Sequence, residues 1–566
     1  MTRVDGPLVD VEGVPVAAMS EVVELGADRL AAEVVAIRGD RFTTQAYEYT
    51  GGLKPGDPVG TRGRPLSARL GPGLLGGVFD GLLRPLSGAP TWLRPGAHGE
   101  QPASKWRFVP VARAGATVRA GEVLGRVADA GTVDHRVLVP PGGGGRLDHL
   151  APEGTYADTE VVARVGQTEI ALVSAWPVRR PRPYAARLDG AAPLVTGQRV
   201  LDVLFPIARG STAAVPGGFG TGKTMLLQQV AKWCDADVIV YVGCGERGNE
   251  MAEVLQELSE LDDPRRGGRL ADRTVIIANT SNMPMMAREA SIYTGVTVAE
   301  YYRDMGHDAV VIADSTSRWA EALREFASRS GALPAEEGYP ADLASALAAF
   351  YERAGVVTTL GGARGSVTII GAVSPAGGDM SEPVTSHTQR FVRSLWTLDR
   401  ELAYARHYPA VSWADSFSRD AAPLAAWHTR EGDPAWSGRR AQVTALLAEA
   451  DRLASIADLV GAASLPGHER MVLLGGRLLR EGLLQQSALS PNDAFCSAPK
   501  AAALVDLVLD VVSTCEELVA RGVPAATVEE VDFSAVLRAR EDVGPDDAAA
   551  VRARRDDVVA RLEALS

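Results

Sequence analysis

Residues 216–224 read PGGFGTGKT and match the pattern GxxxxGK[ST]. Strand-like residues and a turn precede the match, and the helical run MLLQQVAKW follows it. In that context the glycines let backbone N–H groups wrap around phosphate oxygens, and the helix N-terminus adds its partial positive charge. The stretch predicts a phosphate-binding loop, and a helix-capping glycine turn is the alternative. It leaves open whether the chain hydrolyses a nucleotide or only binds one.

Two residues of the loop have individual expected roles. Lys223 should contact the β and γ phosphates, and the Thr224 hydroxyl should ligate magnesium. The 58 cationic side chains of the chain include only five lysines, so a compact ammonium is favoured here for more than its charge. The other nucleotide-binding residues predicted in the loop are Gly217, Gly218, Phe219, Gly220, Thr221 and Gly222.

Two apolar runs elsewhere deliver charged residues to the ends of predicted strands. The run VVIADSTSRW ends its strand at Asp314, where a magnesium-organising carboxylate is expected, although an Asp at such a place can also simply form a turn. The run VIVYVGCGERGNEM carries Glu246 and Arg247 into a glycine-flanked loop. Glu246 could polarise a water that attacks the γ phosphate, and Arg247 could stabilise charge on the transferred group. Binding alone would not need this glutamate.

The pattern of the chain changes three times. Short β-rich runs separated by turns fill the N-terminal part, apolar strands alternate with helices from about Leu201 to Arg406, and helical periodicity dominates after about Ala422. The predicted class is α/β multidomain. The expected boundaries are an N-terminal β-barrel at 1–66, a connection at 67–100, an extra all-β module at 101–180, a P-loop α/β domain at 181–420 and a helical bundle at 421–566.

One segment and the composition limit the function classes. Residues 176–184, WPVRRPRPY, are interpreted as a strap along the core domain, with a peptide ligand or basic patch as the alternative. A net charge of -13 argues against general nucleic-acid binding. No signal peptide or membrane-spanning run is expected, so the protein should be cytoplasmic unless a partner holds it at a membrane. Buried reduced thiols are expected at Cys234, Cys244, Cys496 and Cys515.

Long stretches of unusual composition support a specific resemblance. They include GPGLLGGVFDGLLRPL, TGQRVLDVLFPIARGSTAAVPG, YVGCGERGNEM, IANTSNMPMMAREASIYTGVTVAEYYRDMGHD, ADSTSRWAEALRE, FYERAG and SPAGGDMSEPVT. With them the chain resembles the catalytic A-subunit family of the V-type and A-type rotary ATPases (ATP synthases) nearly end to end. The resemblance implies a β-barrel, a β module specific to this family, a P-loop RecA-like parallel-sheet core and a helical domain.

The resemblance also implies roles for single residues. It makes Glu246 the catalytic base-like residue, Lys223 and Thr224 the phosphate and magnesium contacts, and Asp314 the Walker B acid. It places Arg247 and Arg318 near the γ phosphate. Family members hold the adenine between aromatic side chains, for which Phe417 and Phe495 are the candidates here. The expected cofactor is Mg²⁺ with ATP or ADP and phosphate.

The family's assembly sets the expected partners. A non-catalytic B subunit should alternate with this chain in a hexameric ring and supply an arginine finger. Central shaft and peripheral stalk subunits and a membrane sector that moves protons or sodium should complete the complex, with no nucleic acid. The chain is therefore expected at the cytoplasmic face of the cell membrane, as a peripheral component.

Two loop residues depart from the family's pattern. Family members usually have Pro where this chain has Gly218, and Ser or Cys where it has Thr221. Gly218 should loosen the empty loop by about 1 kcal/mol of backbone entropy. Thr221 removes the thiol through which eukaryotic relatives can be switched by oxidation, so that regulation is not predicted.

Three other functions stay open from the sequence. A non-catalytic regulatory subunit would have a damaged loop or a substituted Glu246, and neither is seen. An RNA translocase or secretion-system ATPase would share the core but lack the extra β module, and the translocase should also carry a strand-binding face. A purely structural ring component is the third.

Overall fold

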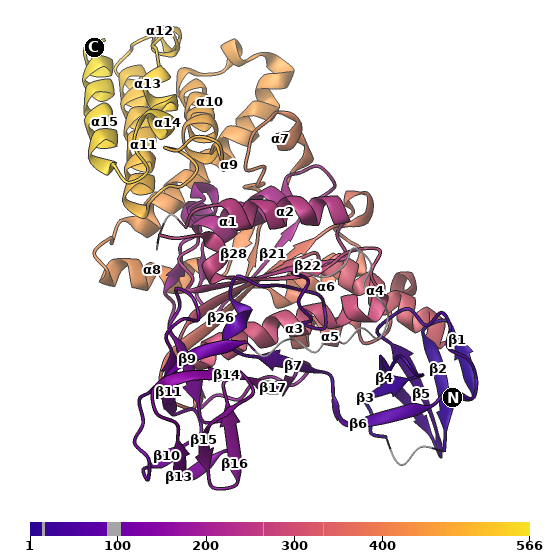
Figure 1. Ribbon diagram of the computed structural model, residues 1–566. Coiled ribbons are helices and arrows are strands. Elements are labelled where there is room, and N and C mark those ends of the chain that lie inside the picture. The colour runs from indigo at the N-terminus through magenta and orange to yellow at the C-terminus, as the bar shows by residue number, and fades with distance from the viewer. Residues whose placement is uncertain (14–16, 88–103, 264, 266, 332, 566) are drawn as a thin grey trace.

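The computed structural model describes residues 1–13, 17–87, 104–263, 265, 267–331 and 333–565 (Figure 1). An antiparallel sheet opens the chain, and its apolar side chains, including Val9, Val23 and Val34, bury a small core of their own. Its strand order is β1-β2-β5-β4-β3-β6. The strands are β1 (Arg3–Asp5), β2 (Leu8–Glu12), β3 (Glu21–Leu25), β4 (Leu30–Arg38), β5 (Arg41–Ala46) and β6 (Val59–Pro65).

The segment after this sheet contributes strands to two other sheets. Strand β7 (Ser67–Leu70) pairs with β17 (Ser174–Pro177), and after the turn η1 (Pro72–Leu74) strand β8 (Val78–Phe79) runs parallel to β23 (Thr274–Asn279). The sequence predicted only a connection here, because strands this short, separated by glycine and proline, show no periodicity. Residues 88–103, which include the predicted start of the next module, lie outside the described residues.

A second all-β module follows, as the sequence predicted. Two four-stranded sheets, β10-β13-β15-β16 and β12-β11-β9-β14, enclose a cluster that contains Phe108, Leu124 and Leu147. Its strands are β9 (Lys105–Pro110), β10 (Thr117–Arg119), β11 (Val123–Val127), β12 (His135–Leu138), β13 (Gly144–Leu150), β14 (Gly154–Ala157), β15 (Val161–Val165) and β16 (Thr168–Ala171).

The core domain is built on a mostly parallel sheet. Its order is β28-β27-β21-β26-β24-β22-β23-β8, with β25 and β18 continuing beside β26. The central strands are continuous apolar runs because both faces of the sheet are covered. The strands are β18 (Ala186–Arg187), β21 (Thr212–Pro216), β22 (Val238–Cys244), β24 (Asp308–Asp314), β25 (Gly355–Thr358), β26 (Arg364–Val373), β27 (Ser394–Leu395) and β28 (Phe417–Ser418), and a separate pair is β19 (Pro193–Leu194) and β20 (Ile207–Ala208).

Helices cover the two faces of this sheet (Figure 1). On one face α1 (Lys223–Trp233) and α2 (Gly248–Glu260) pack against the sheet, and on the other lie α3 (Met285–Asp304), α4 (Thr316–Ser330) and α5 (Leu343–Tyr351). The remaining elements of the domain are η2 (Val200–Leu204), η3 (Leu270–Arg273), η4 (Glu336–Gly338), η5 (Ala376–Gly378), α6 (Pro383–Phe391) and α7 (Arg400–Tyr404).

The proline- and arginine-rich segment 176–184 lies along the core domain as a strap. Arg179 forms ion pairs with Glu289 of α3 and with Glu33 of the N-terminal sheet, at 2.6 and 3.2 Å. Arg182 pairs with Asp304 at the end of α3, at 2.7 Å. Arg182 is buried and Arg179 is not, but both guanidinium groups pair with carboxylates of the same chain, which favours the interpretation as a strap over that of a free basic patch.

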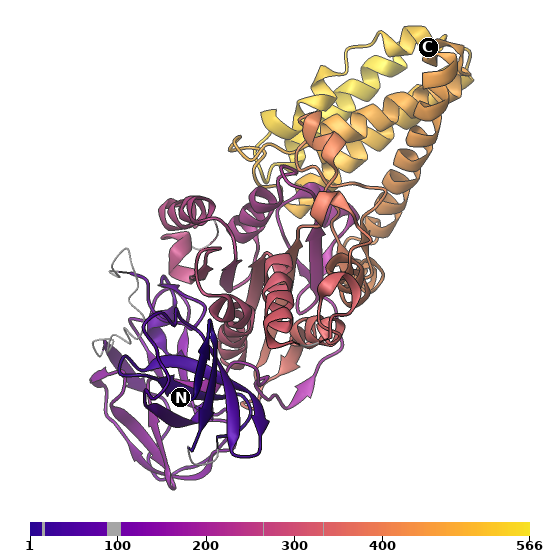
Figure 2. The same ribbon diagram turned by 90° about the vertical axis from the view of Figure 1, so that its right-hand side faces the viewer.

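The C-terminal part is helical, as predicted. Figure 2 shows that this part and the N-terminal sheet lie at opposite ends of the core domain. None of the helices in the described ranges is both long and apolar enough to cross a bilayer. The elements are α8 (Ala421–Arg430), α9 (Trp436–Val460), η6 (Ala462–Ser464), α10 (Gly467–Leu479), η7 (Arg480–Leu484), α11 (Ala498–Ala520), α12 (Ala525–Glu529), α13 (Ser534–Leu537), α14 (Ala539–Asp542) and α15 (Ala548–Glu563).

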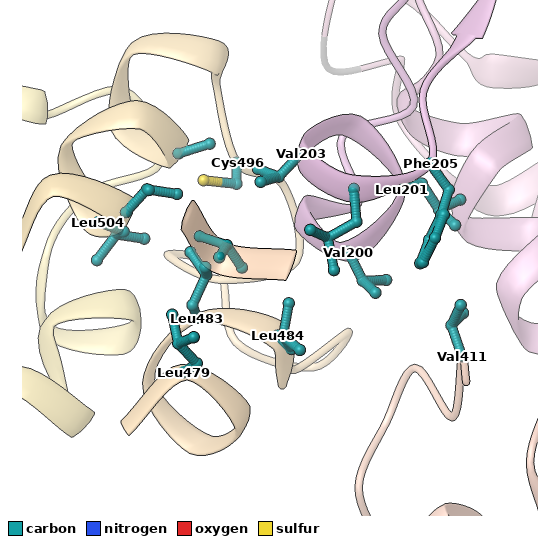
Figure 3. Packing of buried hydrophobic residues seen from close by; sticks show 14 of the residues in the cluster. Val200, Leu201, Val203, Phe205, Val411, Leu479, Leu483, Leu484, Cys496 and Leu504 are labelled. Carbon is teal, nitrogen blue, oxygen red and sulfur yellow. The ribbon is translucent and has the colours of Figure 1, made fainter. Parts of the chain in front are cut away.

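A buried junction joins the core domain to the helical domain. The π-helical turn η2 inserts apolar side chains, among them Val200 and Leu201, beside Leu484 of η7 (Figure 3). On the helical-domain side Cys496 lies close to Val203 (Figure 3). All four cysteines are buried and unbonded to one another, which confirms the expected reduced thiols.

One arginine ties the polar groups of this junction together. Arg199 is 1 % exposed, and its guanidinium pairs with Asp493 at 2.5 Å while donating to the carbonyl oxygens of Leu483 and Gln485 at 2.7 and 2.6 Å. Asp493 also pairs with Arg540 at 2.6 Å. The junction is therefore fixed by a charged network in an apolar setting, where an unpaired charge is costly.

Replacing Asp493 with Asn should destabilise the helical domain by about 3–5 kcal/mol, because it leaves the Arg199 guanidinium buried without a counter-charge. Thermal unfolding followed by circular dichroism should show a lower midpoint. The matched control is Asp5→Asn, which breaks an exposed pair with Arg3. Equal midpoints for the two variants would contradict the prediction.

Candidate functional site

The predicted phosphate loop runs from the buried strand β21 to helix α1. Gly220 and Gly222 have φ angles of 80° and 88°, a backbone region that favours glycine. Gly222 directly precedes the first helical residue, Lys223. The loop thus leads directly into the N-terminus of α1, and the free N–H groups at the start of a helix are the arrangement that binds phosphate.

The loop is held closed by its own side chains. The Thr221 hydroxyl donates to the Gly218 carbonyl oxygen at 2.8 Å. The Lys223 ammonium donates to the carbonyl oxygens of Gly217 and Gly218 at 2.6 and 3.0 Å. Burial lowers the pKa of Lys223, and the nearby Asp314 and Glu246 carboxylates oppose that effect. The Lys223 ammonium is therefore bound to two carbonyl oxygens, and a bound phosphate would compete with them for it.

Asp314 is the last residue of β24 and lies beside the loop. Its Oδ2 accepts hydrogen bonds from the Thr224 hydroxyl at 3.2 Å and from the Tyr241 hydroxyl at 3.1 Å. Burial raises the pKa of this carboxyl, and the two hydroxyl donors oppose the rise. A carboxylate and a hydroxyl oxygen side by side are the donors that Mg²⁺ prefers. Among the described residues no cluster of three or more His, Cys, Asp or Glu could hold a metal ion by itself.

Glu246 follows β22 and faces the same edge of the sheet. Burial, together with the neighbouring Asp314 and Glu250 carboxylates, raises the pKa of Glu246 to about 7. Gly245, with φ 76°, makes the turn possible, since a Cβ there would lie 2.7 Å from Cβ of Arg318. The structure thus brings Glu246 together with the phosphate loop and Asp314.

The two predicted arginines lie on the rim of the site. Arg318 in α4 is near enough to affect the ionisation of both Glu246 and Lys223, and it pairs with Glu321 at 2.9 Å. Arg247 precedes α2, and its guanidinium lies 5.9 Å from the ring centre of Phe219 at the tip of the loop. The Arg247 side chain is 68 % exposed and Phe219 is 87 % exposed, so this side of the site is open.

The two predicted adenine-binding aromatics both pack against other side chains of the chain. Phe417 packs with the apolar residues beneath the sheet and under the Arg419 guanidinium, 5.2 Å from its ring centre. Phe495 stacks on Trp233 at the far end of α1, with ring centres 5.2 Å apart. That end is about 15 Å from the phosphate loop along the helix axis. Neither of these contacts involves the loop.

Tyr408 is the aromatic residue that does lie against the loop. A methyl group placed on Gly222 would lie 3.5 Å from Cε1 of Tyr408, and the Tyr408 side chain is 44 % exposed. Its carbonyl oxygen accepts from the backbone N–H of Gln486 in the helical domain at 2.8 Å. Sequence reasoning missed this residue; the only available signal was an aromatic before a proline in HYPAV, soon after the core sheet.

Four family models match the chain in order. The matches are the ATP synthase alpha/beta family beta-barrel domain at residues 1–63, the ATPsynthase alpha/beta subunit barrel-sandwich domain at 101–179, the ATP synthase alpha/beta family nucleotide-binding domain at 197–418, and the C-terminal domain of V and A type ATP synthase at 425–523. The order confirms the predicted fold class.

Curated relatives match over nearly the whole chain. The V-type ATP synthase alpha chain of Nitrosococcus oceani is 51 % identical over 95 % of this chain and 93 % of its own length. That of Anaeromyxobacter sp. strain K is 50 % identical over 100 % and 99 %. The A-type ATP synthase of Methanopyrus kandleri has a chain that is 46 % identical over 94 % and 92 %. The chain belongs to the V-type and A-type ATP synthase alpha-chain family.

A solved structure gives a wider comparison for this V/A-type chain. The assembled ATPase EscN of the enteropathogenic E. coli type III secretion system aligns with a TM-score of 0.65, covering 90 % of this chain and 99 % of EscN. At 22 % identity the likeness shows the fold alone. It agrees with the expectation that secretion-system ATPases share the core architecture.

The two unusual loop residues of this V/A-type chain have different settings. Gly218 has open space where a Cβ would be, and its φ lies outside the left-handed region. Thr221 is buried and keeps the loop-closing hydroxyl. The cysteine closest in sequence to Glu246 is Cys244, and burial raises the pKa of its thiol to about 12. A thiol in that state is a poor redox switch.

Replacing Gly218 with Pro should tighten binding of ATP up to about fivefold, because proline restricts the free loop and a Cβ at this position meets no atom within 4 Å. Calorimetric titration of ATP into the full chain measures this directly. Gly218→Ala is the control for adding a side chain and should have a smaller effect. Weaker binding by the proline variant would show that the bound loop needs a backbone conformation closed to proline.

Proposed function

We propose that this chain is the catalytic subunit of a V/A-type rotary ATPase and that it hydrolyses or synthesises ATP. The observation that carries the proposal is the position of Glu246, which shares one edge of the sheet with the phosphate loop and Asp314. A chain that only bound nucleotide would not need a carboxylate there. The full-length similarity to V-type and A-type ATP synthase chains supports the same function.

Binding of the triphosphate would use the loop and Lys223. The loop N–H groups and the helix N-terminus hold the phosphate oxygens, and Lys223 exchanges its contacts with the Gly217 and Gly218 carbonyls for the β and γ phosphates. Magnesium held by Thr224 and Asp314 would neutralise charge on the phosphate oxygens. Thr224 directly follows Lys223 at the start of α1. The helix therefore fixes the spacing between the magnesium ligand and the phosphate-binding lysine.

Hydrolysis would depend on Glu246. The carboxylate orients a water molecule toward the γ phosphorus and accepts its proton as the bond to the ADP oxygen breaks. Burial makes the carboxylate a stronger base than an exposed Glu, since it raises the pKa to about 7. Arg318 and Arg247 on the rim would stabilise the charge of the transferred group.

The base end of the nucleotide would lie on Tyr408. Its exposed ring rests against the end of the phosphate loop, and aromatic rings stack well on adenine. We also keep the proposal that Phe495, at the far end of α1, contacts the adenine. For Phe417, which packs under the sheet, we propose support of the segment that carries Tyr408.

We further propose that the site is completed by a partner. The exposed side chains of Arg247 and Phe219 mark an open side of the site. A non-catalytic B subunit in an alternating hexameric ring would supply the arginine finger on that side. Central shaft, peripheral stalk and membrane ion-translocating subunits would couple the reaction to proton or sodium transport. The chain would then lie at the cytoplasmic face of the cell membrane, as a peripheral component of the complex.

ATP hydrolysis should be low for this chain alone and should appear when the B-type partner is added. Glu246→Gln should then lower kcat at least about a hundredfold while ATP still binds, because only the base is lost. Phosphate release measures turnover, and calorimetry measures binding.

Glu253→Gln is the control, since this exposed residue lies on the same helix α2. Unchanged turnover in Glu246→Gln would defeat the catalytic assignment. Full activity of the chain alone would contradict the proposal that a partner completes the site. Stimulation of hydrolysis by RNA would instead favour the RNA translocase.

The activity should also depend on pH through Glu246. The base acts only when ionised, so kcat/KM should fall about tenfold per pH unit below the pKa of about 7 and level off above it. Glu250→Gln removes a carboxylate that raises this pKa, so the fall should begin at lower pH. The Glu253→Gln profile should match the wild type. A Glu250→Gln profile that shifts upward would contradict the assignment.

A further inference from the structure

Tyr241 is an unusual residue in the centre of the core sheet. The strand VIVYVGC is otherwise apolar, and Tyr241 is 1 % exposed with its ring packed in the cluster that contains Leu227 and Val230 of α1. A hydroxyl in such a place is costly unless it has a partner. Its partner is Oδ2 of Asp314, at 3.1 Å.

The same oxygen of Asp314 accepts from Thr224, but the two donors differ in what holds them. Thr224 belongs to the first turn of α1, next to a loop that must rearrange around phosphate. Tyr241 belongs to β22, which pairs on both sides, with β23 and β24. Tyr241 is therefore the donor whose position does not depend on the state of the loop.

A fixed donor matters because Asp314 has a competing neighbour. The Lys223 ammonium interacts with the Asp314 carboxylate electrostatically, although it donates its hydrogen bonds to Gly217 and Gly218. A carboxylate free to rotate toward Lys223 would form an ion pair, and that pair would withdraw both groups from the nucleotide. The hydrogen bond from the Tyr241 hydroxyl keeps the Asp314 carboxylate turned toward strand β22 of the sheet.

We propose that Tyr241 is a positioning residue whose buried hydroxyl holds Asp314 in the orientation that accepts a divalent cation beside Thr224. The inference rests on the proposed function, in which Asp314 and Thr224 serve a magnesium-bound nucleotide. Tyr241 contacts neither nucleotide nor cation. It acts through the carboxylate, as hydrogen-bonded outer partners of metal ligands do.

The test compares ATP binding to the full chain with excess Mg²⁺ and with EDTA, by calorimetry. Tyr241→Phe removes only the hydroxyl, and the ratio of the two affinities should fall about tenfold, with affinity in EDTA unchanged within roughly twofold. Tyr302→Phe is the matched control. Tyr302 is also wholly buried, and its hydroxyl has no hydrogen-bond partner among the described residues. Its ratio should equal that of the wild type.

A second comparison separates positioning from general damage. In an Asp314→Asn background the Tyr241→Phe change should alter the Mg²⁺ ratio no further, because its effect passes through the carboxylate. An unchanged ratio in Tyr241→Phe alone, equal losses in both backgrounds, or a variant that fails to fold while Tyr302→Phe folds would each overturn the inference. A wild-type chain whose ATP affinity ignores Mg²⁺ would instead overturn the proposed function.

Discussion

Parallel pairing of the central strands is the constraint on which the site depends. Pro216 of β21 lies opposite Val373 of β26, and Asp314 of β24 lies opposite Gly243 of β22. Because these strands run in one direction, their carboxyl ends meet at one edge, and the residues that follow them converge there. The separation between the phosphate loop and Glu246 is thus set by backbone hydrogen bonds. Loop side chains then need only small adjustments to reach a nucleotide.

The charges at this edge support the proposal that the site takes up a cation. Asp314 is buried and Glu246 is partly buried beside a single ammonium, Lys223, and the pKa of each carboxyl is raised. In a setting of low dielectric, two carboxylates and one ammonium are an unbalanced set. In the function proposed above, a divalent cation would restore the balance beside the phosphates. The rim arginines add positive charge on the open side.

The sequence contained the parts of the site that depend on local pattern. Consecutive residues encode the glycine loop, the apolar runs ending in Asp314 and Glu246, and the helical end of the chain. Each of these could therefore be predicted from the sequence. Strand β8 was missed because two residues carry no periodicity, and its pairing with β23 is a long-range contact. Tyr408 was missed for a similar reason. Which aromatic residue reaches the loop is decided by how the segment after β27 packs, and Phe417 in the same segment turns beneath the sheet instead.

The junction around Arg199 links Tyr408, the residue proposed to hold the base, to the helical domain. Gln486 donates its backbone N–H to the carbonyl of Tyr408, and its side chain donates to the Gly197 carbonyl at 2.8 Å. Arg199 holds the same segment through Gln485 and Asp493. These contacts are buried and partly charged, so separating them would expose unpaired groups to an apolar environment. The segment from Gln485 to Asp493 therefore moves with the core domain. Any displacement of the helical bundle relative to the phosphate loop would have to break these contacts, including the pair between Asp493 and Arg540, or carry Tyr408 with it.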